Sequence, residues 1–467
     1  MGAARLVRSE GSGSARNFGI LVRPFSQLWN RWWTRGLTHD SKNGSMSIDP
    51  EGRLRVRLRT EDHWPRIADE LSRVVDLEAS ARAAGAFQRA REVRDPETLL
   101  RLVLAYGSGG MSLRDVSGWA EEQRIASLSS PALFKRLCNA EGWLGGIVAA
   151  LLEKRIKLRN YRLYGHRLCA IDATTLCEPG ADRTTWRVHV AYDVASGGVD
   201  QLELTDVHGG ESLKRFTFRP GDIVLADRGY ARPRDLRPVI EAGANLIVRT
   251  GWNSLRLLTA QGAVFDLFAK LRTMKTAYAD AKVYLDEGVP EVEPLALRLV
   301  IRRKTKEQAR KAQQELVKDA RKRGREPDPK SLEAARFLLL LTSLPAGELT
   351  AATVANLYRL RWQIELAFKR YKSLAGLDEL TAKTPRLARS WIHAKLILAL
   401  LAERIAGLAP DSPPCALRTT ETHALAVASH EGHPQASHPR NSRPSALDHE
   451  IDPDYAGAHS LRAAASP

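Results

Sequence analysis

The chain has 467 residues, 43% of them hydrophobic, which is enough for a large buried core and two or three domains. No stretch approaches the roughly 18 consecutive apolar residues of a membrane-spanning helix, which argues against membrane insertion. The formal net charge of +17 attracts polyanions and favours nucleic acid as the partner, although arginine-rich solvated surfaces would explain the same excess.

The cysteine content argues against a disulfide-stabilised or zinc-binding protein. The four cysteines are Cys138, Cys169, Cys177 and Cys415. They are few and scattered, and none stands in a C-x-x-C spacing. We therefore expect a reduced, cytoplasmic protein, associated with the nucleoid if its partner is DNA.

The N-terminal third divides into an extension and a helical region. Residues 1–45 are rich in Arg, Gly and Ser, and Met46 opens a run that resembles a natural start, so residues 1–45 are interpreted as a disordered or wrongly assigned extension. Residues 46–160 follow a helical pattern, which we interpret as a DNA-binding domain. Ser112 and Ser130 can each cap a short helix, which predicts a helix-turn-helix; an ordinary helical bundle explains the pattern equally well.

At His166 the hydrophobic period changes to that of strands. Strands are predicted at residues 167–172, 186–194, 199–205, 222–227 and 245–250, with short helices at residues 212–218 and 231–242. This order describes a mixed α/β sheet. We assign residues 161–249, together with residues 350–408, to one α/β domain.

The remaining segments are an insertion, two helices and a tail. Residues 250–349 contain probable strands at residues 281–285, 295–302 and 337–341 around a charged helix at residues 305–325. Helices at residues 350–374 and 386–408 close the ordered part. Residues 409–467 are rich in Pro, Ser and His without apolar periodicity, which predicts a disordered or frameshifted tail.

Two aspartates occupy strand positions that are expected to be buried, where a charged side chain is unfavourable. Asp172 ends the apolar run Leu-Cys-Ala-Ile, and Asp227 ends the run Ile-Val-Leu-Ala. An unpaired buried carboxylate is costly, so these positions indicate a metal, a charged partner or an active site. The alternative is that two unrelated strand-end aspartates cap turns.

A third acid lies on one face of the helix predicted at residues 350–374. Tyr358, Arg361, Glu365 and Lys372 recur at steps of three, four and seven, which places them on one helix face. The residues of the apolar stripe that can face the core are Leu357, Leu360, Ile364 and Phe368. A solvated charged face is the alternative.

The order of these residues resembles a known motif. The spacing Y-x2-R-x3-E-x6-K from Tyr358 to Lys372, behind Asp172 and Asp227, resembles the Y-R-E-K motif and DDE triad of family-four bacterial insertion-sequence transposases. The resemblance covers roughly residues 60–408. It implies an RNase-H-like catalytic core of the retroviral-integrase type, an N-terminal helical DNA-binding region and a β-rich insertion at residues 250–349.

The resemblance also implies the chemistry of the site. Asp172, Asp227 and Glu365 would hold two Mg²⁺ ions, with Mn²⁺ as a possible substitute, since hard cations prefer carboxylate oxygens. Such a site cleaves DNA at the ends of an insertion sequence and transfers the freed strand. Tyr358, Arg361 and Lys372 would bind phosphates beside the cleaved end.

Three further residues carry weaker expectations. Arg228, directly after Asp227, is expected to contact phosphate. Trp252 could stack on an extruded base, but core packing explains it more readily. His189 lies inside a predicted strand and is more often a hydrogen-bonded side chain than a ligand.

The expected partners are double-stranded DNA at terminal inverted repeats, target DNA and a second copy of the chain in a synaptic homodimer. Two alternatives remain open. One is an inactive DNA-binding remnant or inhibitor of transposition; the other is a resolvase-type nuclease of the same fold, which would need neither the insertion nor the Tyr/Arg/Lys face.

Overall fold

The computed structural model describes residues 46–48, 54–56, 60–108, 110–154, 162–181, 183–373 and 375–407. The extension at residues 1–45 and the tail at residues 409–467 therefore lie outside the described part. The chain divides into two compact units, residues 1–71 and 72–467. The first contains the antiparallel strands β1 (Met46–Ile48) and β2 (Leu54–Val56) and nearly all of helix α2 (Thr60–Ser72). No helix among the described residues is long and apolar enough to span a membrane.

The second unit begins with a helical region that packs against the last helix. Its helices are α3 (Leu77–Ala83), α4 (Pro96–Ser108), α5 (Leu113–Glu122), α6 (Ser130–Asn139) and α7 (Glu141–Glu153). Helix α14 (Pro385–Gly407) contacts α4, α6 and α7. A Cβ atom at Gly107 of α4 would lie 2.6 Å from the Cβ of Ala394 in α14, so only glycine permits this close helix contact.

The two helices predicted after Ser112 and near Ser130 are confirmed, but their connection is long. Ser112 and Asp115 form a capping box at the start of α5, and Ser129 caps α6. Residues 123–129 separate the two helices. A helix-turn-helix is typically joined by a turn of three or four residues, so this pair lacks that geometry and fits the helical-bundle alternative.

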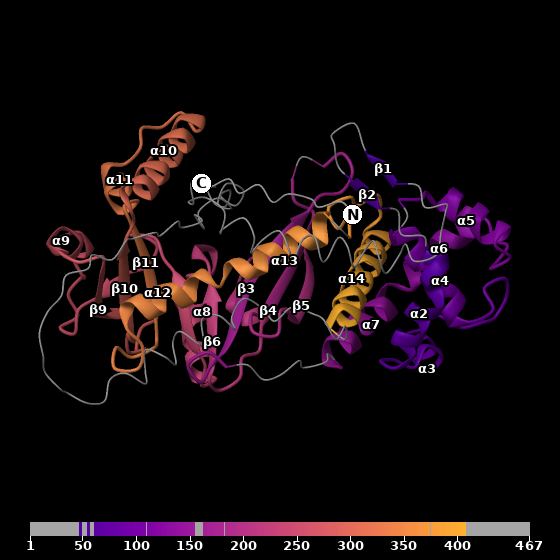
Figure 1. Cartoon of the computed structure of the whole chain (residues 1–467), viewed down its shortest axis with the longest axis horizontal. Helices are drawn as coiled ribbons and strands as arrows, with labels where there is room; N and C mark the ends of the chain where they lie inside the picture. The colour runs from indigo at the N-terminus through magenta and orange to yellow at the C-terminus, as the bar shows by residue number, and fades with distance from the viewer. Residues whose placement is uncertain are drawn as a thin grey trace, which may run out of the picture. The chain divides into compact units, whose positions relative to one another are not determined.

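A nine-stranded mixed sheet forms the centre of the second unit, which confirms the predicted α/β class (Figure 1). Its strands are β3 (Arg167–Leu176), β4 (Trp186–Asp193), β5 (Gly198–Asp206), β6 (Asp222–Ala226), β7 (Asn245–Arg249), β8 (Leu257–Leu258), β9 (Tyr278–Leu285), β10 (Leu295–Arg303) and β11 (Phe337–Thr342). The order is β5-β4-β3-β6-β7-β11-β10-β9-β8. The pairs β3–β6 and β6–β7 are parallel, and the other pairs are antiparallel.

The strands of residues 250–349 extend this same sheet, because β11 pairs with β7. One hydrophobic cluster runs through both parts and includes Ile171, Val248, Leu299 and Leu341. The shorter elements are the 3-10 helices η1 (Leu213–Arg215) and η2 (Arg228–Tyr230) and the helices α8 (Pro233–Glu241), α9 (Leu267–Thr273), α10 (Lys306–Lys322) and α11 (Pro329–Ala334). The predicted insertion thus shares its core with the rest of the sheet.

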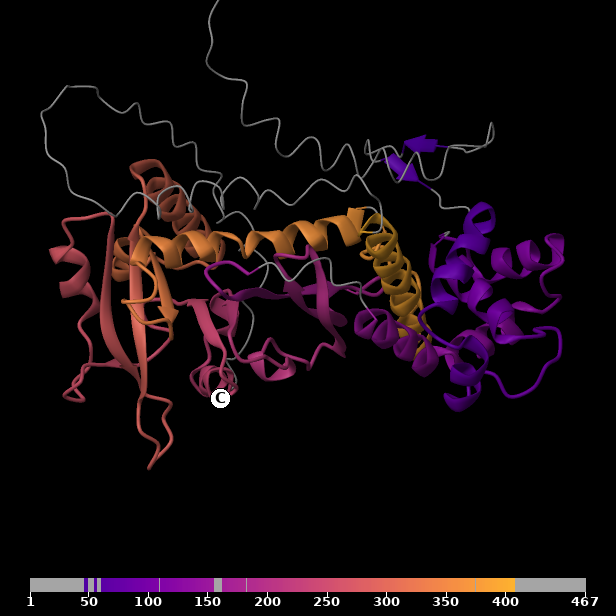
Figure 2. The same cartoon turned by 60° about the horizontal axis from the view of Figure 1, so that its bottom comes forward.

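The helix predicted at residues 350–374 is divided into two, α12 (Ala351–Arg359) and α13 (Trp362–Ser373), which follow one another along the sheet (Figure 2). The backbone N–H groups of Gln363 and Ile364 donate to the carbonyls three residues earlier, at Leu360 and Arg361. This tighter turn interrupts the α-helical pattern that the spacing predicted, and it lies at Arg361.

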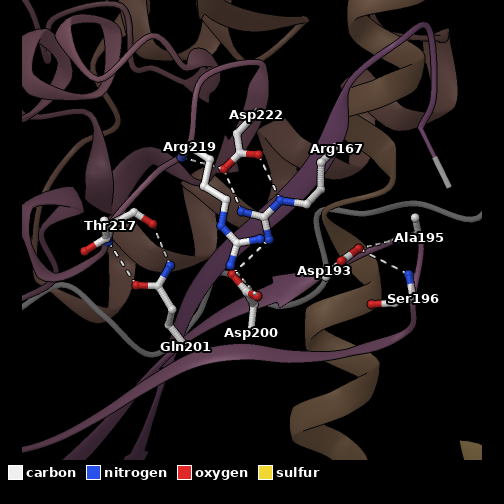
Figure 3. A network of polar contacts seen from close by, with 9 residues as sticks. All are labelled: Arg167, Asp193, Ala195, Ser196, Asp200, Gln201, Thr217, Arg219 and Asp222. Atoms are coloured by element: carbon white, nitrogen blue, oxygen red, sulfur yellow. Dashed lines mark hydrogen bonds and ion pairs between the residues drawn. The ribbon is translucent and has the colours of Figure 1, made fainter. Parts of the chain in front are cut away.

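A buried ion-pair network joins the first ends of β3 and β6 (Figure 3). The Arg167 guanidinium donates to both carboxylate oxygens of Asp222, at 2.8 and 2.6 Å, and to Asp200 on β5 at 2.9 Å. Asp222 is 2% exposed and also accepts a hydrogen bond from the Arg219 backbone N–H. Because Arg167 and Asp222 are register partners, the network fixes the alignment of the two parallel strands.

Replacing Asp222 by alanine is expected to lower the free energy of unfolding by about 3–5 kcal/mol, since it leaves the Arg167 charge buried with only Asp200 as partner. Urea unfolding of the purified chain measures the loss. Asp193→Ala is the matched control, because the Asp193 carboxylate accepts two neutral backbone hydrogen bonds, from the N–H groups of Ala195 and Ser196 (Figure 3). Equal losses in both variants would contradict the importance of the charged network.

Candidate active site

The register of the parallel pair β3–β6 places Asp172 beside Asp227. Ile171 pairs with Ala226, so the next residue on each strand is the acid. Asp227 directly follows β6, as predicted, and accepts a hydrogen bond from the Gly229 N–H at 2.8 Å. Asp172 was predicted at the end of its strand, but β3 continues to Leu176, because the residues beyond Asp172 still pair with β4. Both acids nevertheless lie at the same level of the sheet.

Glu365 approaches the aspartates from α13, which packs against β3. The guanidinium of Arg361 connects the two elements: it lies 3.5 Å from Asp172 Oδ2 and donates a hydrogen bond to Glu365 Oε1. The structure therefore brings Asp172 from a strand and Glu365 from a helix to the buried guanidinium of Arg361. These residues are far apart in the sequence and meet only in the folded chain.

The electrostatics of Asp172 reflect this crowding of acids. Burial raises the pKa of Asp172 to about 7; Arg361 opposes the shift, while Asp227 and Glu365 add to it. Among the described residues, no three Asp, Glu, His or Cys side chains stand close enough to hold a metal ion in this arrangement. Arg361 supplies the positive charge between Asp172 and Glu365 instead.

Tyr358 and Arg361 are not part of a solvated face, because they are only 6% and 8% exposed. The Arg361 guanidinium lies 5.9 Å from the centre of the Tyr358 ring, in cation–π range. Burial acts to lower the pKa of Arg361, but Tyr358, Asp172 and Glu365 together raise it above its usual range. Lys372 is half-buried, seven residues after Glu365 on the same helix.

Arg228, Trp252 and His189 lie in different environments. Arg228 is exposed beside Asp227. Trp252 donates its indole N–H to Ser331 at 3.0 Å and packs edge-on against Phe268, an arrangement that agrees with the packing alternative. His189 is buried and hydrogen-bonds the Thr205 hydroxyl at 3.0 Å, and burial lowers its pKa to about 4, so it is a neutral hydrogen-bonded side chain.

Two residues near the aspartates did not stand out in the sequence. Glu211 lies in the segment between β5 and η1, and Tyr230 ends η2 directly after the Asp-Arg-Gly run. Electrostatic interactions link the Tyr230 phenol to Asp172, Asp227 and Glu211. Glu211 belongs to no periodic pattern, which is why it was missed; the glycine in Asp227-Arg-Gly-Tyr230 is the one signal of a close neighbour at this turn.

Comparison with known proteins identifies the family. The model of the transposase DDE domain matches residues 163–401. The transposase of insertion sequence element IS421 from Escherichia coli is 42% identical over 360 residues, 76% of this chain and 97% of that protein. The transposase of IS231E from Bacillus thuringiensis subsp. finitimus is 26% identical over 238 residues, 46% of this chain and 48% of that protein.

A piggyBac transposase, determined by cryo-electron microscopy in a synaptic complex with hairpin DNA, covers 79% of this chain and 84% of its own at 10% identity. Its TM-score of 0.33 is too low to support an argument about the fold. The transposase DDE domain and the similarity to the IS421 transposase each extend over half or more of the chain. The chain belongs to the transposase DDE family and is a DNA transposase of the insertion-sequence type.

Proposed function

We propose that this transposase holds two divalent ions, Mg²⁺ or in its place Mn²⁺, on Asp172, Asp227 and Glu365. It uses them to cleave DNA at the ends of its insertion sequence and to transfer the freed strand in cut-and-paste transposition. The observation that carries this proposal is the pairing of Arg361 with both Asp172 and Glu365, next to Asp227. The three half-buried acids repel one another, so positive charge between them is stabilising.

The donor set fits hard divalent cations. All three acids offer carboxylate oxygens, which Mg²⁺ prefers, and the mutual repulsion that contributes to the raised pKa of Asp172 is what a bound cation relieves. When bound, a pair of such ions activates a water molecule and stabilises the oxyanion that leaves in phosphodiester cleavage. Asp172 would hold both ions, and Asp227 and Glu365 one each.

The basic residues of α12, α13 and η2 would position the DNA. Arg361 suits a phosphate because its guanidinium can form two parallel hydrogen bonds; in this structure it donates one to Glu365 and forms an ion pair with Asp172. Lys372 and the exposed Arg228 would add point charges beside it. Tyr358 would contribute its hydroxyl, which has no hydrogen-bond partner among the described residues.

The DNA partners proposed are the duplex at the terminal inverted repeats and the target duplex, bound by a homodimer in the synaptic complex. The net charge of +17 supports a polyanionic partner. The helical region, which the sequence assigns to residues 46–160, would provide DNA contacts. The mixed sheet, with Asp172 on β3 and Asp227 directly after the parallel strand β6, supports an RNase-H-like catalytic core.

A cleavage assay with the full chain tests this function. A labelled duplex from the junction between the element and its flanking DNA is incubated with Mg²⁺, with Mn²⁺ or with chelator, and a scrambled duplex is the control. We expect a nick at the element end that leaves a 3′-hydroxyl, only with metal and only on the end duplex. Specific end binding without cleavage in either metal would instead favour the inactive remnant or inhibitor.

A further inference from the structure

Glu211 is a fourth acid beside the proposed site, held against the turn that follows Asp227. A Cβ atom built on Gly229 would lie 2.2 Å from Glu211 Oε2 and 3.2 Å from Asp227 Oδ1. Both carboxylates therefore border the same point, and only glycine leaves room for Glu211 there. The Gly229 N–H donates its hydrogen bond to Asp227, so it does not donate one to Glu211.

The charge of Glu211 is poorly compensated by the protein. The Glu211 carboxylate is half-buried, and among the described residues it makes no hydrogen bond or ion pair. Burial raises the pKa of Glu211, Asp227 adds to the increase, and Arg187 and Arg232 oppose it without forming an ion pair. A half-buried carboxylate without an ion-pair partner is costly, so a cation in direct contact with Glu211 would stabilise this arrangement.

An independent observation at the same point is the hydroxyl of Tyr230. The Tyr230 side chain is 0% exposed, and its hydroxyl oxygen has no hydrogen-bond partner in the described part of the chain. The phenol interacts electrostatically with Asp172, Asp227 and Glu211, which places it among these acids. A buried hydroxyl without a partner is expensive, and it is a donor available to orient a carboxylate.

We propose that Glu211 is a fourth carboxylate of the metal centre, on the side of Asp227, and that Tyr230 is a positioning residue that orients these carboxylates. This inference rests on the proposed metal-dependent function. Glu211 would help Asp227 to hold a divalent cation, since such cations prefer carboxylate oxygens. The absence of a side chain at Gly229 then leaves room for both carboxylates on the same side of the turn.

The test measures Mn²⁺ binding to the full chain by calorimetry without DNA, so that it does not depend on activity. Glu211→Gln keeps the shape and removes the charge. We expect its Mn²⁺ affinity to fall at least about tenfold, in the range found when groups supporting a metal ligand are removed. Glu203→Gln on β5 is the matched control, because Glu203 pairs with Arg215 and should leave Mn²⁺ affinity unchanged. Unchanged affinity in Glu211→Gln overturns the assignment.

Thermal unfolding of Glu211→Gln, compared without and with Mn²⁺, gives a second test. Without metal, Glu211→Gln should raise the melting temperature or leave it unchanged, because it removes a repelled charge. With Mn²⁺, the increase in melting temperature should be smaller than in the unsubstituted chain. A melting temperature that falls equally with and without Mn²⁺ would indicate a structural role and overturn the proposal.

Tyr230→Phe should weaken Mn²⁺ binding less than Glu211→Gln does. An unchanged Mn²⁺ affinity in Tyr230→Phe excludes the positioning role of Tyr230.

Mn²⁺ binding to Asp172→Asn and Asp227→Asn shows whether a negative result concerns Glu211 alone or the whole metal centre. If Asp172→Asn and Asp227→Asn lose Mn²⁺ binding while Glu211→Gln keeps it, only the role of Glu211 is wrong. If the two aspartate variants also bind Mn²⁺ normally, the metal centre is not at these acids, and both proposals fail.

Discussion

Substitution of Asp172, Asp227 or Glu365 by alanine is expected to abolish Mg²⁺-dependent nicking at the element end, with a loss of at least about 10³-fold in rate for each. The reason is that each acid would hold metal rather than DNA, so a single loss disables the ion that activates water or stabilises the leaving oxygen. End binding measured without metal should remain nearly intact. Single-turnover cleavage and end-DNA affinity are measured on the same preparations.

The folded state of these variants needs its own control. Asp172→Ala leaves Arg361 with Glu365 alone, and a buried charge that loses a partner is destabilising. Asp172→Asn keeps the volume and the hydrogen bond from the Ala173 N–H, so it should lose cleavage with a smaller change in melting temperature. Glu203→Ala, on the same sheet, should cleave normally. Metal-dependent cleavage that survives in any one variant removes that residue from the proposed triad.

Substitution of Arg361 or Lys372 is expected to weaken the hold on DNA without emptying the metal site. Each residue that neutralises one phosphate contributes about one unit to the salt dependence of binding, so the slope should fall by about one in Arg361→Ala and in Lys372→Ala. Arg361→Lys should be poorly tolerated, because the ammonium keeps the charge and loses the planar fork. End-DNA affinity across a salt series gives the slopes.

The position of Arg361 sharpens this test. In the folded chain Arg361 already pairs with Asp172 and Glu365, so Mn²⁺ binding to Arg361→Ala should be maintained or become tighter, because a competing cation is removed. Arg359→Ala is the control of equal charge, since Arg359 is exposed on α12. An unchanged salt slope together with lost Mn²⁺ affinity would show that Arg361 serves only to pair with the acids.

The sequence by itself determined the class of the fold and the residues of the candidate site. Strand and helix periods are local properties, so β4 to β7, β10, β11 and α14 were predicted close to their bounds, while β3 runs four residues further than predicted. The resemblance carried by Asp172, Asp227 and the spacing from Tyr358 to Lys372 agrees with the transposase family found by comparison. The periods of strands and helices and the spacing of the motif both depend only on the order of residues along the chain.

Only the tertiary structure decided how these residues meet. The register of β3 against β6, which makes Asp172 and Asp227 neighbours, depends on pairing between segments separated by some fifty residues. The pairing of β11 with β7, which joins the predicted insertion to the sheet, is likewise non-local. The turn at Leu360 and Arg361 breaks a helix whose spacing looked continuous. Glu211, proposed above as a fourth acid, lies in an irregular segment, so no periodic pattern indicates it; only the folded chain places it near Gly229 and Asp227.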